Sequence, residues 1–309
     1  MSRRTLVIDT DPGQDDAVAL LLAFAHRADF DVRFVATVAG NVDLAKTTVN
    51  ALRVRDLAGA GDVPVHAGSA GPMILPLETA EYISGPDGLA GSGLPAPASR
   101  VADGHAVDAL IRLVRAEPPG SVAVCALGPL TNLAMAFRLA PDIVPRLGPL
   151  SIMGGALSLG NVTPAAEFNF YVDPHAASVV LGAGAKIALF GLDLTHQALA
   201  SPAHVERLAA LGTKTGTSVH GMLTRPRAGG MATRAHPMHD PCTVAWLLWP
   251  ELFEGRDCHV EMATDGALRG RSTIDWHGRT KRPANAYVAS KVDAGALFDR
   301  MIDSLARLP

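Results

Sequence analysis

The sequence predicts an α/β protein with an open, mostly parallel β-sheet, helices on both faces and a small β layer near the C-terminus. Short apolar runs typical of strands alternate with helical patterns over the first two-thirds of the 309 residues. Such alternation is typical of βαβ units, which build parallel sheets covered by helices. Residues 258–290 instead alternate in short strand-like pieces, and no linker or internal repeat divides the sequence. We therefore expect residues 1–309 to form a single domain.

The predicted strands are short apolar runs, several of them rich in β-branched residues. In chain order they are residues 6–8, 32–38, 63–66, 121–127, 149–153 and 186–190. The predicted helices follow polar or turn-forming breaks, and they are residues 15–26, 44–58, 130–139, 241–248 and 294–308. Acidic residues open the first of these helices, and a proline stands at the first position of the fourth, where its fixed φ angle is favourable. In such a sheet, ligands bind beyond the carboxyl ends of the strands, where this sequence has its polar and glycine-rich breaks.

Composition and charge exclude several classes of function. The chain has 48% hydrophobic residues and a net charge of −3, with its 27 basic and 30 acidic side chains spread without long runs. This distribution offers no concentrated basic face for nucleic acid. Three cysteines without close pairing argue against a disulfide framework or a cysteine-based zinc site. The longest apolar run, residues 17–25, is far shorter than the roughly 20 residues that span a bilayer, and the N-terminus does not resemble a signal peptide. We expect a cytoplasmic enzyme that binds neither nucleic acid nor membrane.

Two long stretches fall outside the strand and helix rhythm. Residues 69–103 are rich in proline and glycine, and residues 214–239 carry several arginines and histidines without a clear period. A long irregular segment is usually a functional flap or a disordered region. We interpret both as flap loops over the strand ends.

The most informative feature is an acidic turn after the first predicted strand. Residues 9–16 read Asp-Thr-Asp-Pro-Gly-Gln-Asp-Asp. One of these acids could cap the following helix while the others face solvent, which is common in Asp-rich turns. However, the Pro-Gly turn should bring Asp11 back towards Asp15 and Asp16 at the edge of the sheet. A hard cation bound by oxygen ligands would stabilise such a cluster, so the turn predicts a metal site.

Two further motifs could belong to the same site. Asp240 precedes Pro241, so it should lie at a helix N-cap, with His239 just outside; alone, both would be structural or surface residues. A glycine-rich turn leads into Asn161, Glu167 and Asn169. These three could be turn residues or hydrogen-bonding groups for a polyhydroxyl ligand.

Together these segments resemble a known family. Residues 9–16, Gly-Pro-Leu-Thr-Asn at 128–132, Met-Gly-Gly-Ala at 153–156 with residues 161–169, and His-Asp-Pro-Cys at 239–242 occur in order along the chain. This arrangement resembles the calcium-dependent nucleoside hydrolases, the inosine/uridine-preferring family. The resemblance implies a Rossmann-like α/β domain that hydrolyses the N-glycosidic bond of ribonucleosides to ribose and free base, and it suggests a homodimer or homotetramer.

The resemblance also implies a Ca²⁺ site and the catalytic residues. Asp11, Asp16 and Asp240 would ligate Ca²⁺ through their side chains, and Leu127 through its backbone carbonyl. Asp11 would also act as general base on the Ca²⁺-bound water. Since the departing base needs a proton, His239 is the candidate acid, because an imidazole titrates near pH 6.5 in the absence of perturbation, about where a neutral-pH proton donor is needed.

The substrate contacts follow by the same resemblance. Asp15 and Asn169 would hold the ribose 2′ and 3′ edge, and Asn41 would add a sugar contact. Asn161 and Glu167 would hold the 5′-hydroxyl. The remaining members of the expected substrate site are Met153 below the ribose ring, Phe168 and the metal ligand Asp240.

One departure from the family bears on the leaving base. Ser84 stands where many members carry a histidine, so protonation of the base would rest on His239 alone or on a residue from 214–236. His66, His105 and His196 are interpreted as structural or surface residues. The sequence does not choose between purine and pyrimidine nucleosides. A non-catalytic nucleoside- or ribose-binding protein of the same fold is the alternative, although the presence of both Asp11 and His239 favours catalysis.

Overall fold

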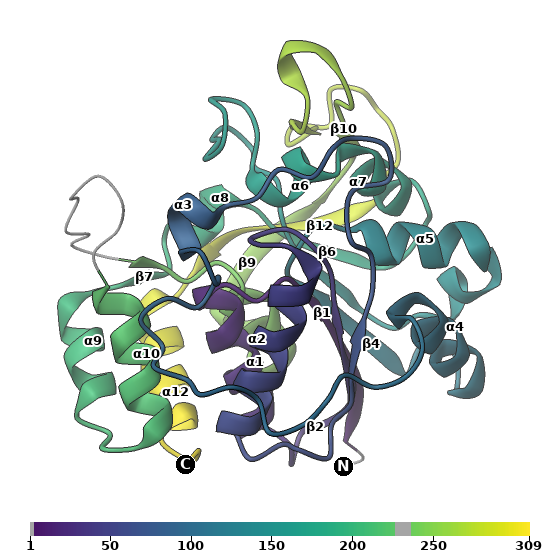
Figure 1. The fold of residues 1–309 in the computed structure, drawn as a ribbon. Coiled ribbons are helices and arrows are strands. Elements are labelled where there is room, and N and C mark those ends of the chain that lie inside the picture. Colours follow the sequence, from purple (N-terminus) through teal and green to yellow (C-terminus); the bar gives the residue numbers. More distant parts are fainter. Residues whose placement is uncertain (1–2, 226–235) are drawn as a thin grey trace.

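A computed structural model of the protein describes residues 3–225 and 236–309. Within these residues, the central sheet has eight strands in the order β3-β2-β1-β4-β5-β6-β12-β9 (Figure 1). Its strands are β1 (Arg4–Thr10), β2 (Phe30–Thr37), β3 (Val65–Ala67), β4 (Val122–Ala126), β5 (Leu150–Met153), β6 (Ile187–Phe190), β9 (Phe253–Cys258) and β12 (Ala286–Val292). Neighbouring strands are parallel except for β12 and β9. The predicted mostly parallel α/β fold is confirmed.

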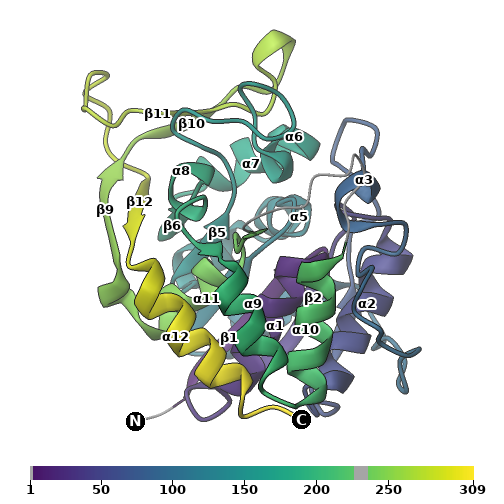
Figure 2. The same cartoon turned by 90° about the vertical axis from the view of Figure 1, so that its left-hand side faces the viewer.

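Helices cover both faces of this sheet. They are α1 (Gln14–Ala25), α2 (Leu44–Leu57), α3 (Glu81–Ser84), α4 (Ala106–Ala116), α5 (Thr131–Leu139), α6 (Phe168–Val172), α7 (Pro174–Leu181), α8 (Leu192–Thr195), α9 (Pro202–Ala209), α10 (Lys214–Thr224), α11 (Pro241–Leu248) and α12 (Ala294–Leu305). Side chains alternate between two cores: Leu6 and Ile8 of β1 join the core formed with α1, α11 and α12, whereas Val7 joins the core formed with α4, α5 and α7. This alternation is the period-two pattern of a strand that is buried on both faces. Figure 2 shows α9 and α10 beside α12, near the end of the molecule where both termini lie.

The strand order places a binding crevice between β1 and β4. The chain passes from β1 outward to β2 and β3, and then returns to the other side of β1 with β4, β5 and β6. In open α/β sheets, ligands bind at the carboxyl ends of the strands where the order reverses in this way. The acidic turn after β1 and the Gly128-Pro129 turn after β4 both lie at that point.

The C-terminal strands divide between two sheets. β12 pairs with β6, so β12 and β9 extend the central sheet. β10 (Val260–Met262) and β11 (Ser272–Ile274) form a separate antiparallel pair, which is the small β layer expected near the C-terminus. A third short pair joins β7 (Leu199–Ala200) to β8 (His236–Pro237). No helix in residues 3–225 and 236–309 has both the length and the apolar character needed to cross a membrane.

The first part of the stretch interpreted as a second flap loop, residues 214–239, is helical. Lys214–Thr224 forms α10, and Thr213 caps it by accepting a hydrogen bond from the Gly216 backbone amide at 2.9 Å. Gly216 and Gly221 obscured this helix in the sequence because glycine disfavours helices. Both glycines permit close packing: a Cβ at Gly216 would lie 2.5 Å from the Leu208 carbonyl oxygen of α9, and one at Gly221 would lie 2.3 Å from that of Gly91. Residues 226–235 of this stretch lie outside the described residues.

The stretch predicted as the first flap, residues 69–103, contains one short helix, α3, and is attached to the body at several points. The Asn41 carbonyl accepts a hydrogen bond from the Ala80 backbone amide at 2.9 Å. Asp173, the N-cap of α7, accepts the Met73 backbone amide at 2.9 Å. Asn50 donates to the Asp87 carbonyl at 2.6 Å. These bonds hold the segment along the crevice side of the sheet.

Candidate active site

The acidic turn between β1 and α1 fixes the carboxylate of Asp16. Asp16 Oδ1 accepts hydrogen bonds from the Thr10 hydroxyl at 2.5 Å and the Asp11 backbone amide at 3.3 Å, and Oδ2 accepts the Gly13 amide at 3.0 Å. These donors lie at the N-terminus of α1, where unpaired amides favour a negative charge. Burial and then the charge of Asp15 nevertheless raise the pKa of Asp16 to about 6.

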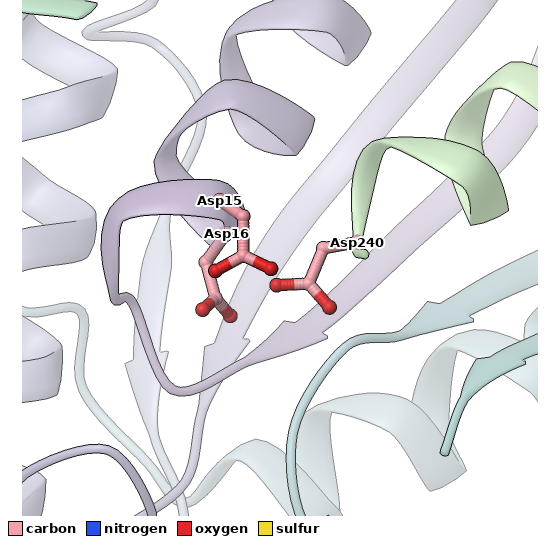
Figure 3. A group of neighbouring side chains, drawn as sticks. All are labelled: Asp15, Asp16 and Asp240. Atoms are coloured by element: carbon pink, nitrogen blue, oxygen red, sulfur yellow. The ribbon is translucent and has the colours of Figure 1, made fainter. Parts of the chain in front are cut away.

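Asp240 joins this cluster from the far end of the sequence. It lies at the N-cap position of α11, as predicted, but its side chain makes no capping hydrogen bond. Instead, the carboxylates of Asp15, Asp16 and Asp240 point toward one another, with one oxygen of each within 4.8 Å of the others (Figure 3). Burial, and after it the charges of Asp15, Asp16 and Asp11, raises the pKa of Asp240 well above its usual range. The acids of the two distant segments therefore meet in space.

Asp11 lies fully buried behind this cluster. Its Oδ2 accepts the Asn41 backbone amide at 2.7 Å, whereas its Oδ1 has no hydrogen-bond partner within the described part of the chain. Gly40 and Gly128, from the ends of β2 and β4, make room for it: a Cβ at Gly40 would lie 2.1 Å from Oδ2, and one at Gly128 would lie 2.3 Å from Oδ1. Burial and then the charge of Asp16 raise the pKa of Asp11 well above its usual range.

The cluster fits a hard divalent cation. Its donors are carboxylate oxygens, and Leu127 lines the same cavity. Ca²⁺ prefers such oxygen ligands. An orphaned, buried Asp11 oxygen beside acids that raise one another's pKa is the arrangement a bound cation would stabilise. Within the described residues, the three closest carboxylates are those of Asp15, Asp16 and Asp240; the participation of Asp11 as a ligand stays a prediction.

Asp9, the first acid of the turn, serves a different network. Its Oδ1 accepts a hydrogen bond from Asn132 Nδ2 at 2.8 Å, and Asn132 Oδ1 accepts the Ser69 amide at 2.8 Å and the Ser69 hydroxyl at 2.9 Å. Burial raises the pKa of Asp9 to about 7. These bonds connect β1, the start of α5 and the beginning of the flap, so Asp9 supports the edge of the site.

A cavity of about 280 Å³ opens above the acidic cluster. It has room for a small polar ligand, and it lies at the carboxyl ends of the strands. The predicted site residues that line it are Asp15, Asp16, Asn41, Leu127, Met153, Asn161, Glu167, Phe168, Asn169, His239 and Asp240. The structure thus brings most of the predicted site to one cavity, whereas Asp11 is fully buried and does not line it.

Backbone hydrogen bonds hold one wall of the cavity. Asn169 Nδ2 donates to the carbonyl oxygens of Leu127 at 2.6 Å and Met153 at 3.2 Å, which leaves its Oδ1 as the acceptor for a ligand. Glu167 accepts the backbone amides of Gly155, Asn169 and Phe170 and so caps α6. Burial raises the pKa of Glu167 to about 7 against these three hydrogen bonds. Glu167 therefore has a structural role in addition to the predicted contact with a 5′-hydroxyl.

Two histidines, His196 and His239, also line the cavity. Nδ1 of His239 lies 2.7 Å from the Thr195 hydroxyl oxygen, and the ring centroids of His239 and His196 are 5.5 Å apart. His196, interpreted from the sequence as a structural or surface residue, is exposed, and it also lines the cavity. The sequence offered no periodic signal for it, because it follows the four-residue helix α8.

The flap contributes residues that sequence reasoning did not assign. Ser84 is buried, and its hydroxyl donates to Asn41 Oδ1 at 3.2 Å, so it orients a predicted sugar contact. Tyr82 and Ile83 line the cavity although they are 56% and 41% exposed. The further unassigned lining residues are Gln14, Ala80, Val162, Leu223, Pro237 and Met238. Most of them come from the two irregular stretches, whose course over the sheet the sequence pattern does not reveal.

Comparisons with known proteins find relatives that match nearly the whole chain. The family model for the inosine-uridine preferring nucleoside hydrolases matches residues 6–299. A pyrimidine-specific ribonucleoside hydrolase RihA from Shewanella sp. (strain ANA-3) is 38% identical over 311 residues, covering 98% of this chain and 96% of that protein. A plant nucleoside hydrolase, PpNRh1, superposes with a TM-score of 0.90 at 33% identity over 99% of both chains. A purine-preferring ribonucleoside hydrolase from Gardnerella vaginalis has a TM-score of 0.88 at 28% identity over 98% of both chains.

The chain belongs to the inosine-uridine preferring nucleoside hydrolase family. The family resemblance and the enzyme class predicted from the sequence, an N-ribohydrolase, are confirmed.

Proposed function

We propose that the protein hydrolyses ribonucleosides to ribose and free base in the 280 Å³ cavity, with a Ca²⁺ ion held above Asp11. The observation that carries this proposal is the meeting of Asp240 with the acidic turn, beside the unpartnered Asp11 oxygen. A site built only to bind a neutral sugar would gain nothing from several buried acids that repel one another. The negative charge of these acids would stabilise both a bound cation and a transition state that develops positive charge.

The residues that would hold Ca²⁺ are Asp11, Asp16 and Asp240 through their carboxylates and Leu127 through its carbonyl oxygen. When bound, the ion would lower the pKa of a coordinated water and orient it. The hydrogen bonds that fix Asp16 and Asn169 support this assignment, because they orient ligand groups before a cation arrives.

The protein's own side chains would then act on both sides of C1′: on the attacking water and on the leaving base. Oδ1 of Asp11 accepts a proton from the attacking water as its oxygen bonds to C1′. Asp15, Asn169 and Asn41 hold the ribose hydroxyls, and the surrounding carboxylates stabilise positive charge on an oxocarbenium-like sugar. The electron pair of the C1′–N bond leaves with the base, and His239 supplies the proton that this base needs.

The base preference is open to a direct experiment. The related proteins named above differ in it, one being pyrimidine-specific and another purine-preferring. Release of reducing sugar from inosine, uridine and cytidine should be measured with and without a calcium chelator. We expect release from at least one nucleoside, and its loss in the chelator. Absence of release from all three with Ca²⁺ present would refute the proposed function and favour a binding protein.

We expect 2′-deoxyuridine to be a much poorer substrate than uridine. Asp15, Asn169 and the proposed metal-binding acids Asp16 and Asp240 line the same cavity, where the 2′ and 3′ hydroxyls of ribose would bind. The missing 2′-hydroxyl of deoxyuridine therefore removes contacts to several groups at once. A site built to bind a hydroxyl rejects the analogue without it by about 10⁴-fold or more. Comparison of kcat/KM for the two nucleosides tests this, and similar values would show that the diol does not enter the acidic cluster.

Replacement of His239 by alanine should affect substrates according to their leaving group. Uridine needs protonation of its base, so kcat should fall by about 10²- to 10⁴-fold. p-Nitrophenyl riboside releases a stable anion and should lose less than about threefold, because its departure does not use general-acid catalysis. Steady-state rates with both substrates provide the measurement, and equal losses would remove His239 from the role of acid.

Three predictions made from the sequence remain proposals: a single domain over residues 1–309, a cytoplasmic location, and assembly as a homodimer or homotetramer. A small ribonucleoside is the proposed partner of the cavity, which agrees with the family of the chain.

A further inference from the structure

The buried side chain of Thr195 contacts the imidazole ring of His239. Thr195 ends α8, is 0% exposed, and holds its hydroxyl oxygen 2.7 Å from His239 Nδ1. A buried hydroxyl needs a hydrogen-bond partner, and within the described residues His239 Nδ1 is the partner of the Thr195 hydroxyl. The pair therefore links a buried, fixed group to a histidine on the cavity wall.

The backbone brings these two residues together through a short strand pair. β7 and β8 pair Leu199 with Pro237 and Ala200 with His236, and the Met238 amide donates to the Ala198 carbonyl at 2.8 Å. This antiparallel register carries the chain back along α8, so that His239 arrives beside Thr195. The contact is set by backbone pairing rather than by a flexible side chain reaching across the cavity.

The segment that carries Thr195 is itself firmly held. Asp193 of α8 accepts the Leu157 amide at 2.5 Å and the Ser158 hydroxyl at 2.5 Å. Gln197 donates to the carbonyl oxygens of Asp193 and Ser290, each at 2.8 Å, which joins α8 to β12. A hydroxyl on such a support can fix the orientation of an imidazole ring.

We propose that Thr195 is the positioning residue for His239: its hydroxyl engages Nδ1 and so directs proton transfer to the leaving base through Nε2. This inference rests on the proposed function, in which His239 protonates the base. A hydrogen bond to one ring nitrogen of histidine sets which nitrogen acts. Small errors in the placement of such a group are costly, since a displacement of about 1 Å can lower a rate by about 10²-fold.

In this step His239 gives one proton to the leaving base. The imidazolium of His239 donates Nδ1–H to the Thr195 oxygen and presents its Nε2 proton to the base. As the C1′–N bond breaks, its electron pair moves to the base nitrogen, and the Nε2 proton is transferred to the base. The neutral ring keeps the proton on Nδ1, and this N–H stays hydrogen-bonded to the Thr195 oxygen. Over a full turnover, the proton taken from the attacking water balances the proton given to the base.

The experiment compares Thr195→Val with Thr195→Ser on two substrates. Valine keeps the shape of threonine and removes the hydroxyl, so kcat for uridine should fall about 10- to 100-fold, as expected when an acid loses its alignment. p-Nitrophenyl riboside, which needs no proton, should change less than about threefold, because general-acid catalysis is not used. Thr195→Ser restores the hydroxyl and should return uridine turnover to within about threefold of the native rate, since the Nδ1 contact is retained. Inosine or cytidine replaces uridine if it is the better substrate.

Control measurements separate this role from folding. Thr47→Val removes another fully buried threonine hydroxyl, one that bonds to the Leu44 carbonyl in α2 away from the cavity. It should shift the thermal midpoint without changing the ratio of the two substrate rates. If Thr195→Val does not fold, Thr195→Ala gives the same comparison with a smaller side chain.

Each other outcome has a distinct meaning. Unchanged uridine turnover in Thr195→Val, equal losses on both substrates, or failure of Thr195→Ser to restore the rate would overturn the role of Thr195. These results would leave the proposed function intact as long as His239→Ala shows its leaving-group dependence. If native protein releases sugar from no nucleoside, the proposed function itself fails.

Discussion

Asp11→Asn should lower kcat for nucleoside hydrolysis by about 10³-fold or more, a loss expected when a general base and a metal contact disappear together. Asparagine has nearly the shape of aspartate, and its Oδ1 can still accept the Asn41 backbone amide. It cannot take a proton from water. The unpartnered oxygen of Asp11 is thus replaced by a group without basicity, in a site that is otherwise unchanged.

The stability of Asp11→Asn should separate chemistry from folding. The pKa of Asp11 is raised by burial and by the charge of Asp16, so the ionised form costs stability in the absence of a cation. The metal-free variant should therefore unfold at the same temperature as the native protein or higher. Asp108→Asn, an exposed substitution on α4, serves as the control and should keep native turnover and stability. Native-like turnover in Asp11→Asn would rule Asp11 out as the base.

The fold could be predicted well where hydrophobic periodicity and strand-end chemistry agree. The strands β1, β2, β4, β5 and β6 lie close to their predicted positions because each is a short apolar run between turn residues. α10 was missed because Gly216 and Gly221 serve tertiary packing, which local propensity does not register. β9 was not predicted, and the start of β12 was assigned to a separate layer, since the sequence does not reveal that β12 pairs in parallel with β6.

The acidic half of the site could also be predicted, for a physical reason. Residues that follow parallel strands meet at one edge of the sheet, so acids and amides after β1, β2 and β4 must lie near one another. The rest of the cavity lining was harder to predict from the sequence. Tyr82 and Ile83 reach the cavity through the course of the flap, and His196 follows the four-residue helix α8. Elements this short leave no periodic pattern.

Removal of divalent cations should abolish hydrolysis and destabilise the protein in a pH-dependent way. A chelator should lower the rate by about 10²-fold or more, because several kcal/mol of charge stabilisation are lost with the ion. Addition of Ca²⁺ at about 100 times its Kd should stabilise the folded state by about 2.7 kcal/mol and restore the rate. Asp240→Asn should lose most of this response because it removes one of the clustered carboxylates.

The sign of the pH effect follows from the raised pKa of Asp16, about 6 in the folded metal-free protein against its usual value of 3.8. A raised folded pKa contributes stability that is complete below pH 3.8 and is lost as the pH rises through about 6. The same deprotonation creates the charge that a cation binds. The increase in thermal midpoint on adding Ca²⁺ should therefore be larger at pH 8 than at pH 5, as measured by thermal unfolding of chelated and Ca²⁺-loaded protein. An increase that is equal at both pH values, together with full activity in the chelator, would mean that the acids bind no cation and that another group activates the water.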